Sequence, residues 1–230
     1  MIHNMRVVAL VPMKAHSERV PNKNTRMFAN RPLFHHILAT LDLIYAIDEV
    51  VVDTDSEQIA DEAPALFKKV RIVARPAEIC GDMVSMNDII AHDISQSMAD
   101  IYLQMHATSP LLRAETIKDA VLRFAEDEEH DSLFTVNRLQ TRLYWADGKP
   151  VNHDPADLLR TQDLPPIYEE NSCLYAFTKE SFESAGGKRI GLRPMMYETS
   201  PIESIDIDDQ FTFGLAELLA RYAHALEGGF

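Results

Sequence analysis

The sequence predicts an α/β fold in which helices cover both faces of a mostly parallel, doubly wound sheet. Apolar runs of strand length alternate with segments of helical periodicity through the first two thirds of the chain. Strands that alternate with helices build a parallel sheet that is buried on both faces. The polar clusters of this part of the chain follow the expected strands, and ligands bind at that edge of such sheets.

The individual elements follow in chain order. An apolar run at residues 7–11 stops at Pro12 and predicts the first strand, and a helical pattern follows Pro32. Further strands are expected at residues 49–54, 70–74, 101–105 and 132–136. Further helices are expected at 57–67, at 85–98, and around Ile117, Ala120, Val121 and Phe124.

The alternation breaks near Leu139. Residues 139–170 are rich in proline and contain the only tryptophan, which indicates an arm inserted in a single domain of residues 1–230. A loop of this length in a compact domain is usually functional or an interaction arm. Strands are expected again at 173–177 and 204–207. A final helix is expected at 211–222, with Asp208 or Asp209 as its N-cap.

Composition narrows the possible partners. The chain has 230 residues, a formal net charge of −14 and a pI near 5.0, which argues against nucleic acid and anionic membranes as partners. Two distant cysteines, Cys80 and Cys173, suit free thiols in a reducing cytoplasm. The N-terminal apolar run is too short for a signal peptide, and no run approaches membrane-spanning length.

Positive charge is concentrated in the loop after the first strand. This loop carries Lys14, Ser17, Arg19 and Lys23, and it closes at Asn24. Basic side chains neutralise phosphate oxygens, and turn residues direct backbone N–H groups at them. In an acidic chain, this loop predicts a polyphosphate site.

Two further polar clusters follow expected strands, at residues 53–55 and 106–109. The carboxyl ends of parallel strands meet at one edge of the sheet, so we expect these clusters and the basic loop to share one site. Taken alone, His106 in the last cluster fits a buried histidine of the core better than a ligand-binding residue.

A pair of carboxylates, Asp206 and Asp208, ends the expected strand at 204–207. Alternation along a strand places both on one face, within reach of one divalent ion. The alternative is that Asp208 only caps the last helix. Asp53 and Asp55 form a competing pair with the same spacing, for which we favour a helix-capping role.

Six segments in order cover nearly the whole chain: VPMKAHSERVPNKN, VVVDTDSEQIADEA, RPAEICGDMVSMNDII, ATSPLLRAETI, EENSCLYAF and SIDIDDQFTFGLAE. Taken together, they resemble the acylneuraminate cytidylyltransferases, sugar nucleotidyltransferases of the CMP-sialic-acid synthetase type. The relatives that load the eight-carbon acid KDO usually have Gly-Lys-Pro where this chain has Asn22-Lys23-Asn24, which favours the sialic-acid branch.

The resemblance implies a Rossmann-like nucleotidyltransferase sheet and the transfer of CMP from CTP to the anomeric hydroxyl of a 2-keto sugar acid, with release of pyrophosphate. It also implies Mg²⁺ as the cofactor and a homodimer whose arm reaches the partner's site. The implied residues are Lys14, Lys23 and Asp208 for catalysis, Asp206 and Asp208 for the metal, Ser17, Asn24, Ser85 and His106 for the nucleotide, and Arg160, Gln162, Asn171 and Tyr175 for the sugar acid.

The chain departs from the family pattern at a few positions. Lys14 replaces an arginine, His106 stands where a glutamine near the cytosine is expected, and Ser172 replaces a glycine. Ala15 and His16 also replace glycines. These changes bear on the base and the sugar acid that are recognised.

Two other classes of protein remain open. One is a GT-A-like glycosyltransferase, which uses an Asp-x-Asp pair but consumes a nucleotide sugar. The other is a non-catalytic nucleotide-binding relative, which the departures permit. The basic loop speaks against the glycosyltransferase because a triphosphate needs that charge more.

Overall fold

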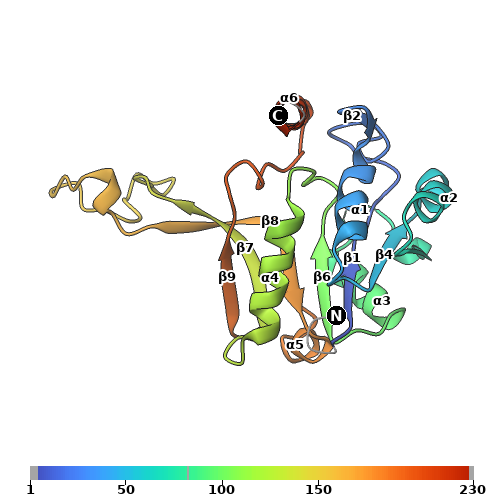
Figure 1. Ribbon diagram of the computed structural model, residues 1–230. Helices are drawn as coiled ribbons and strands as arrows, with labels where there is room; N and C mark the ends of the chain where they lie inside the picture. Colours follow the sequence, from blue (N-terminus) through green and yellow to red (C-terminus); the bar gives the residue numbers. More distant parts are fainter. Residues whose placement is uncertain (1–4, 82, 228–230) are drawn as a thin grey trace.

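A seven-stranded sheet forms the centre of the structure. The computed structural model describes residues 5–81 and 83–227 (Figure 1). The strand order is β5-β4-β1-β6-β8-β7-β9, and only the contacts of β8 with β6 and β7 are antiparallel. The sheet is therefore mostly parallel, as predicted. The strands are β1 Val7–Leu10, β4 Glu49–Thr54, β5 Val70–Ala74, β6 Ile101–Met105, β7 Ser132–Leu139, β8 Ile167–Phe177 and β9 Pro194–Glu198.

Helices pack on both faces of this sheet. Val7 and Ala9 of β1 share a core with α1 (Leu33–Leu43), α2 (Glu57–Leu66) and α4 (Ala114–Glu126). Val8 and Leu10 point to the opposite core, which contains residues of α3 (Met86–Ser95) and α5 (Lys179–Ser184). Successive side chains of a strand point to opposite faces, so β1 contributes to both cores. The doubly wound arrangement is confirmed.

A third apolar cluster lies beyond the carboxyl edge of the sheet. Val20 and Phe28, in the chain after β1, pack with Ile207 and with Phe213 of α6 (Gln210–Glu227). Phe28 belongs to the small hairpin of β2 (Met27–Phe28) and β3 (Arg31–Pro32), and its ring meets that of Phe213 edge to face at 5.6 Å. The cluster holds the C-terminal segment beside the N-terminal loop, as Figure 1 shows for α6 and β2.

The strand predicted at 204–207 is wrong. Residues 201–204 form a turn and 205–208 are irregular, while the additional strand β9 takes the edge position beside β7. Ile207 N–H donates to the backbone oxygen of Thr108 at 2.9 Å, which is a single link rather than a strand ladder. The apolar Ile205 and Ile207 were mistaken for a strand pattern, whereas both belong to the third cluster.

The arm is an extension of two sheet strands. β7 and β8 remain paired from Val136 opposite Glu170 to Leu139 opposite Ile167, and the residues between them continue away from the domain (Figure 1). The arm also contains a short 3-10 helix, η2 (Thr161–Asp163). Its exposed apolar side chains include Trp145 and Leu158.

The cysteines are free thiols, as expected, with Cys173 fully buried and Cys80 partly buried near the 3-10 helix η1 (Ala77–Ile79). None of the helices in residues 5–81 and 83–227 combines the length and the apolar character that crossing a membrane requires.

Candidate active site

A pocket of about 430 Å³ lies at the carboxyl edge of the sheet. Its walls come from the loops after β1, β5 and β6, from the start of α3, and from the C-terminal segment. The pocket therefore joins the basic loop and the cluster at residues 106–109, as predicted, whereas none of residues 53–55 lines it. The predicted site residues that line it are Lys14, Ser17, Lys23, Asn24, His106, Asp206 and Asp208.

The basic loop is held in shape by hydrogen bonds to a largely buried amide and to an exposed carboxylate. The Nδ2 of Asn24 donates to the backbone oxygen of Lys14 at 2.9 Å, and Asn24 is largely buried. The backbone N–H of Ala15 donates to Oδ1 of Asp55 at 2.6 Å. Asn22 adopts a φ of 53°, a left-handed conformation that asparagine tolerates better than most residues. These contacts fix the turn that carries Lys14 and Lys23 into the pocket.

Lys23 connects the basic loop to the acidic segment. Its Nζ donates to the backbone oxygen of Ile207, the residue between Asp206 and Asp208. Burial lowers the pKa of Lys23, and the negative charges of Asp206 and Asp208 partly oppose this effect. The ammonium group is thus placed between the pocket and the two carboxylates.

Asp208 is available to the pocket because Asp209 caps the last helix. Oδ1 of Asp209 accepts a hydrogen bond from the N–H of Thr212 at 2.8 Å, an N-cap contact at the start of α6. Oδ1 of Asp208 instead accepts from Nη2 of Arg19 at 2.7 Å. The alternative in which Asp208 serves only as the cap is therefore excluded.

Asp206 has an unsatisfied oxygen at the pocket wall. Its Oδ1 is buried and has no hydrogen-bond partner among the described residues. Burial raises the pKa of Asp206, against the effects of a hydrogen bond from Thr108 and the charge of Lys23. An unpartnered carboxylate oxygen beside a second carboxylate is a donor set that suits a hard divalent cation. The residues present therefore fit a metal ion at this position.

The competing pair, Asp53 and Asp55, has a structural role. Asp53 is fully buried and forms an ion pair with the guanidinium of Arg75, while Asp55 holds the basic loop through Ala15. The predicted helix-capping role is wrong, because Oγ of Ser56 accepts from the N–H of Ile59 and caps α2.

His106 and Ser85 lie at the same pocket in different ways. His106 lines the wall, and its pKa is lowered to about 4 by burial and by the charges of Arg189 and Lys23. The ring is therefore neutral at physiological pH, and it lies at the pocket wall rather than in the apolar core. Ser85 caps α3 by accepting from the N–H of Asn87 at 3.2 Å, and its neighbours Val84 and Met86 line the pocket.

The residues predicted for the sugar acid lie outside this group. Arg160 forms an ion pair with Asp163 at 2.6 Å in the arm, where Gln162 is part of η2. Asn171 and Tyr175 are buried in β8, where the intervening Ser172 lines the pocket but neither of them does. Within the described chain, the arm residues and the pocket are therefore separate.

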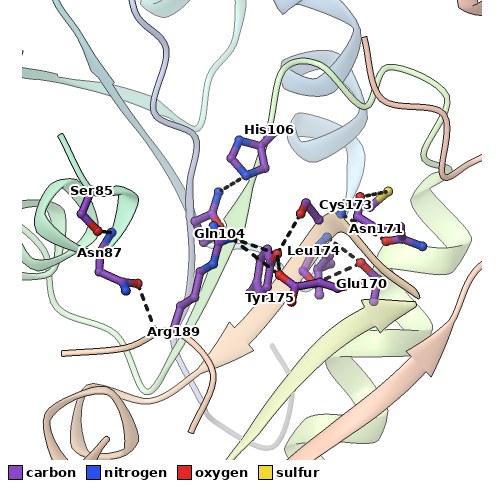
Figure 2. Close-up of polar contacts among 12 residues, drawn as sticks. Ser85, Asn87, Gln104, His106, Glu170, Asn171, Cys173, Leu174, Tyr175 and Arg189 are labelled. Carbon is purple, nitrogen blue, oxygen red and sulfur yellow. Dashed lines mark hydrogen bonds and ion pairs between the residues drawn. The ribbon is translucent and has the colours of Figure 1, made fainter. Parts of the chain in front are cut away.

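Two arginines of the pocket were not predicted. Arg75 directly follows β5, so the rule used for the other strand ends could have found it. Arg189 comes from the loop between α5 and β9, and it stacks on the ring of Tyr175 with 3.7 Å between its Cζ and the ring centroid (Figure 2). A lone arginine in an irregular loop gives no sequence signal, so only the fold reveals it.

The fold and the site define a nucleotidyltransferase. A profile of the cytidylyltransferase family matches residues 8–219, so the chain belongs to this family. Its relatives place it among the acylneuraminate cytidylyltransferases, enzymes that transfer CMP from CTP to keto sugar acids, as the six segments predicted.

The relatives differ in length. The CMP-N,N'-diacetyllegionaminic acid synthase of Legionella pneumophila is 29% identical over 94% of this chain and 96% of its own length. The N-acylneuraminate cytidylyltransferase A of Danio rerio is 30% identical over 92% of this chain, which spans only 50% of that protein. A solved CMP:2-keto-3-deoxy-manno-octonic acid synthetase, complexed with CTP, has a TM-score of 0.70 at 14% identity, over 95% of this chain and 99% of its own. That structure shares the fold.

Proposed function

We propose that this protein transfers CMP from CTP to the anomeric hydroxyl of a sialic-acid-like 2-keto sugar acid and releases pyrophosphate. The observation that carries this proposal is the meeting of the basic loop with Asp206 and Asp208 in one pocket of a cytidylyltransferase fold. The hydroxyl would attack the α-phosphorus, and pyrophosphate would leave in line. Lys14 and Lys23 would stabilise the charge that develops on the phosphate oxygens.

Asp206 and Asp208 would hold Mg²⁺. When bound there, the ion would neutralise phosphate charge and orient the reacting oxygens. The buried, unpartnered Oδ1 of Asp206 supports this assignment, because such an oxygen is costly unless a cation or donor reaches it. Arg19 now forms an ion pair with Oδ1 of Asp208, and this ion pair would have to break when the metal ion binds that oxygen.

The nucleoside would lie along the other wall. Ser17 and Asn24 would shape the phosphate loop, and Ser85 would present the N-terminus of α3. The base would lie against the apolar part of the pocket, which contains Val84, Met86 and Ile89, with His106 at its polar edge.

We also propose a homodimer in which the arm carries Arg160 and Gln162 to the sugar site of the partner. Exposed Tyr144 and Trp145 on the arm support this arrangement, since aromatic residues are enriched at interfaces. The planar fork of an arginine suits the sugar carboxylate. Asn171 and Tyr175 would form the sugar-binding side of the site together with Ser172. Ser172 lies between them in β8 and lines the pocket.

The proposed location is the cytoplasm, because free thiols persist in a reducing compartment. Pyrophosphate release tests the proposal, with each of four nucleoside triphosphates paired with a panel of keto sugar acids. N,N'-diacetyllegionaminic acid belongs in that panel because the Legionella relative is named for it. Turnover should need both CTP and a sugar acid. Consumption of a nucleotide sugar, or no turnover with any pair, would contradict the proposal.

A further inference from the structure

Arg189 fixes the orientation of a buried amide beside the pocket. Its Nη1 donates to Oε1 of Gln104 at 2.6 Å, and Gln104 is fully buried in β6 (Figure 2). A guanidinium group has only donors, so the amide atom that faces it must be the oxygen. Arg189 is itself held by its stacking on Tyr175 and by a 3.0 Å contact from Nη2 to the tyrosine hydroxyl.

The amide nitrogen of Gln104 is therefore directed at His106. Nε2 of Gln104 lies 3.0 Å from Nε2 of His106 and 3.2 Å from the backbone oxygen of Met105. An amide nitrogen only donates, so Nε2 of His106 must accept. A neutral imidazole that accepts at Nε2 carries its proton on Nδ1. The pKa of His106, lowered to about 4, agrees with a neutral ring.

We propose that Arg189 and Gln104 are positioning residues that hold His106 as the Nδ1–H tautomer, so that the ring offers a hydrogen-bond donor to the nucleotide base. This inference rests on the proposed function and extends it to the choice of base. Cytosine presents an acceptor at N3, whereas uracil presents an N–H there. A fixed donor from His106 would favour CTP over UTP, because one of the two donors facing each other in the UTP complex would remain unpaired.

The tautomer of His106 decides what the ring can recognise. A neutral imidazole offers a ligand either a donor or an acceptor once its second nitrogen is engaged. The contacts of Gln104 with Arg189 and His106 select the donor.

Two variants test the contact of Gln104 with His106 and the contact of Arg189 with Gln104 separately. Gln104→Glu keeps an acceptor for Arg189 but replaces the donor to His106 by a carboxylate oxygen, which would draw the ring proton to Nε2. Arg189→Met removes the group that orients the amide. Lys188→Met is the matched control, because Lys188 is the exposed neighbour of Arg189.

The first measurement is the tautomer in the free protein. Nitrogen-15 NMR of the labelled histidines, with the His106 signal assigned from its loss in His106→Gln, should show Nδ1–H at neutral pH. In Gln104→Glu the proton should move to Nε2. A wild-type His106 that is protonated on Nε2, or charged, would overturn the proposal whether or not the enzyme uses CTP.

The second measurement is the ratio of the dissociation constants for UTP and CTP, determined by titration calorimetry. Gln104→Glu and Arg189→Met should reduce this ratio by about 10- to 100-fold, the effect of one unpaired polar group. With the sugar acid present, KM for CTP should rise more than kcat falls. An unchanged ratio in both variants would overturn the proposal. Normal CTP preference without turnover would contradict only the proposed function.

Discussion

Nζ of Lys23 donates a 2.6 Å hydrogen bond to the backbone oxygen of Ile207, which lies between the two pocket carboxylates although it is 184 residues away in the sequence. This contact joins the basic loop after β1 to the acidic C-terminal segment. The ammonium group is half-buried and, among the described residues, makes this hydrogen bond rather than a direct ion pair. Burial lowers its pKa, whereas the charges of Asp206 and Asp208 raise it. The basic loop and the acidic segment are therefore one structural unit.

Lys23→Met should weaken CTP binding while leaving sugar-acid binding nearly unchanged. A hydrogen bond to a charged group typically contributes about 1.5–3 kcal/mol, which corresponds to an affinity loss of roughly 10- to 100-fold. Calorimetric titration with CTP measures the effect. Lys68→Met is the control, because Lys68 is exposed in the turn after α2 and does not line the pocket. Unchanged CTP affinity in Lys23→Met would mean that the loop is only a solvated surface.

Asp208→Asn should abolish most turnover while the protein stays folded. The variant removes one of the two charges that would hold the metal, and loss of an electrostatic stabiliser typically costs about 10²-fold or more in rate. Asp209→Asn is a close control: it alters the adjacent carboxylate, yet asparagine is as good an N-cap as aspartate for α6. Near-normal activity of Asp208→Asn in Mg²⁺ would contradict the metal assignment.

Arg160→Ala should raise KM for the sugar acid far more than KM for CTP. Arg160 pairs with Asp163 in the arm and does not line the pocket of its own chain, so its effect is expected on the partner's site. Lys149→Ala, an exposed change elsewhere on the arm, is the control.

Mixing Arg160→Ala with Asp208→Asn should restore some activity. A hybrid dimer contains one site in which both residues are intact. Light scattering checks the dimer, and subunit exchange must be demonstrated before the activity is compared. A monomer at micromolar concentration, or no recovery after exchange, would contradict the shared site.

The strands at the centre of the sheet could be predicted because they are buried on both faces and read as apolar runs. The polar clusters of Lys14 and His106 could be found for the same reason, since they begin where those runs end. Asp206 and Asp208 were predicted as a pair from their spacing, although the strand expected at residues 204–207 does not form. The pair is positioned by Ile207 in the third apolar cluster, a tertiary contact that local periodicity does not encode.

The contacts that link Arg189, Gln104 and His106 could not be predicted either, because they too are tertiary contacts. Gln104 is a polar residue inside a buried strand, and its partner lies 85 positions away in an irregular loop. Only the antiparallel pairing of β6 with β8 brings Gln104 opposite Tyr175, on which Arg189 stacks. Contacts of this kind depend on strand order, and strand order is not present in the sequence pattern.

A second buried polar group lies beneath the pocket. Asp53 and Asp93 are both fully buried, and no N–H or hydroxyl group of the described residues donates a hydrogen bond to either oxygen of Asp93. Burial, together with the charge of Asp53, raises the pKa of Asp93 above its ordinary value. One proton between the two carboxyl groups, with Arg75 on Asp53, leaves the cluster neutral. His92 also has a ligand atom within 4.8 Å of these groups, so a metal ion is the competing occupant.

Asp93→Asn should become increasingly stabilising relative to the wild type as the pH rises. The native carboxyl retains a proton that the unfolded chain releases above about pH 4, so the wild type loses stability as the pH rises from there towards the raised native pKa. The difference should grow by up to about 1.4 kcal/mol per pH unit, because asparagine has no proton to lose. Urea unfolding at several values between about pH 5 and pH 8 measures it. Asp88→Asn, exposed on the same helix, should show no such slope. A constant difference, or a wild type that is destabilised by a chelator, would show that a proton does not occupy this site.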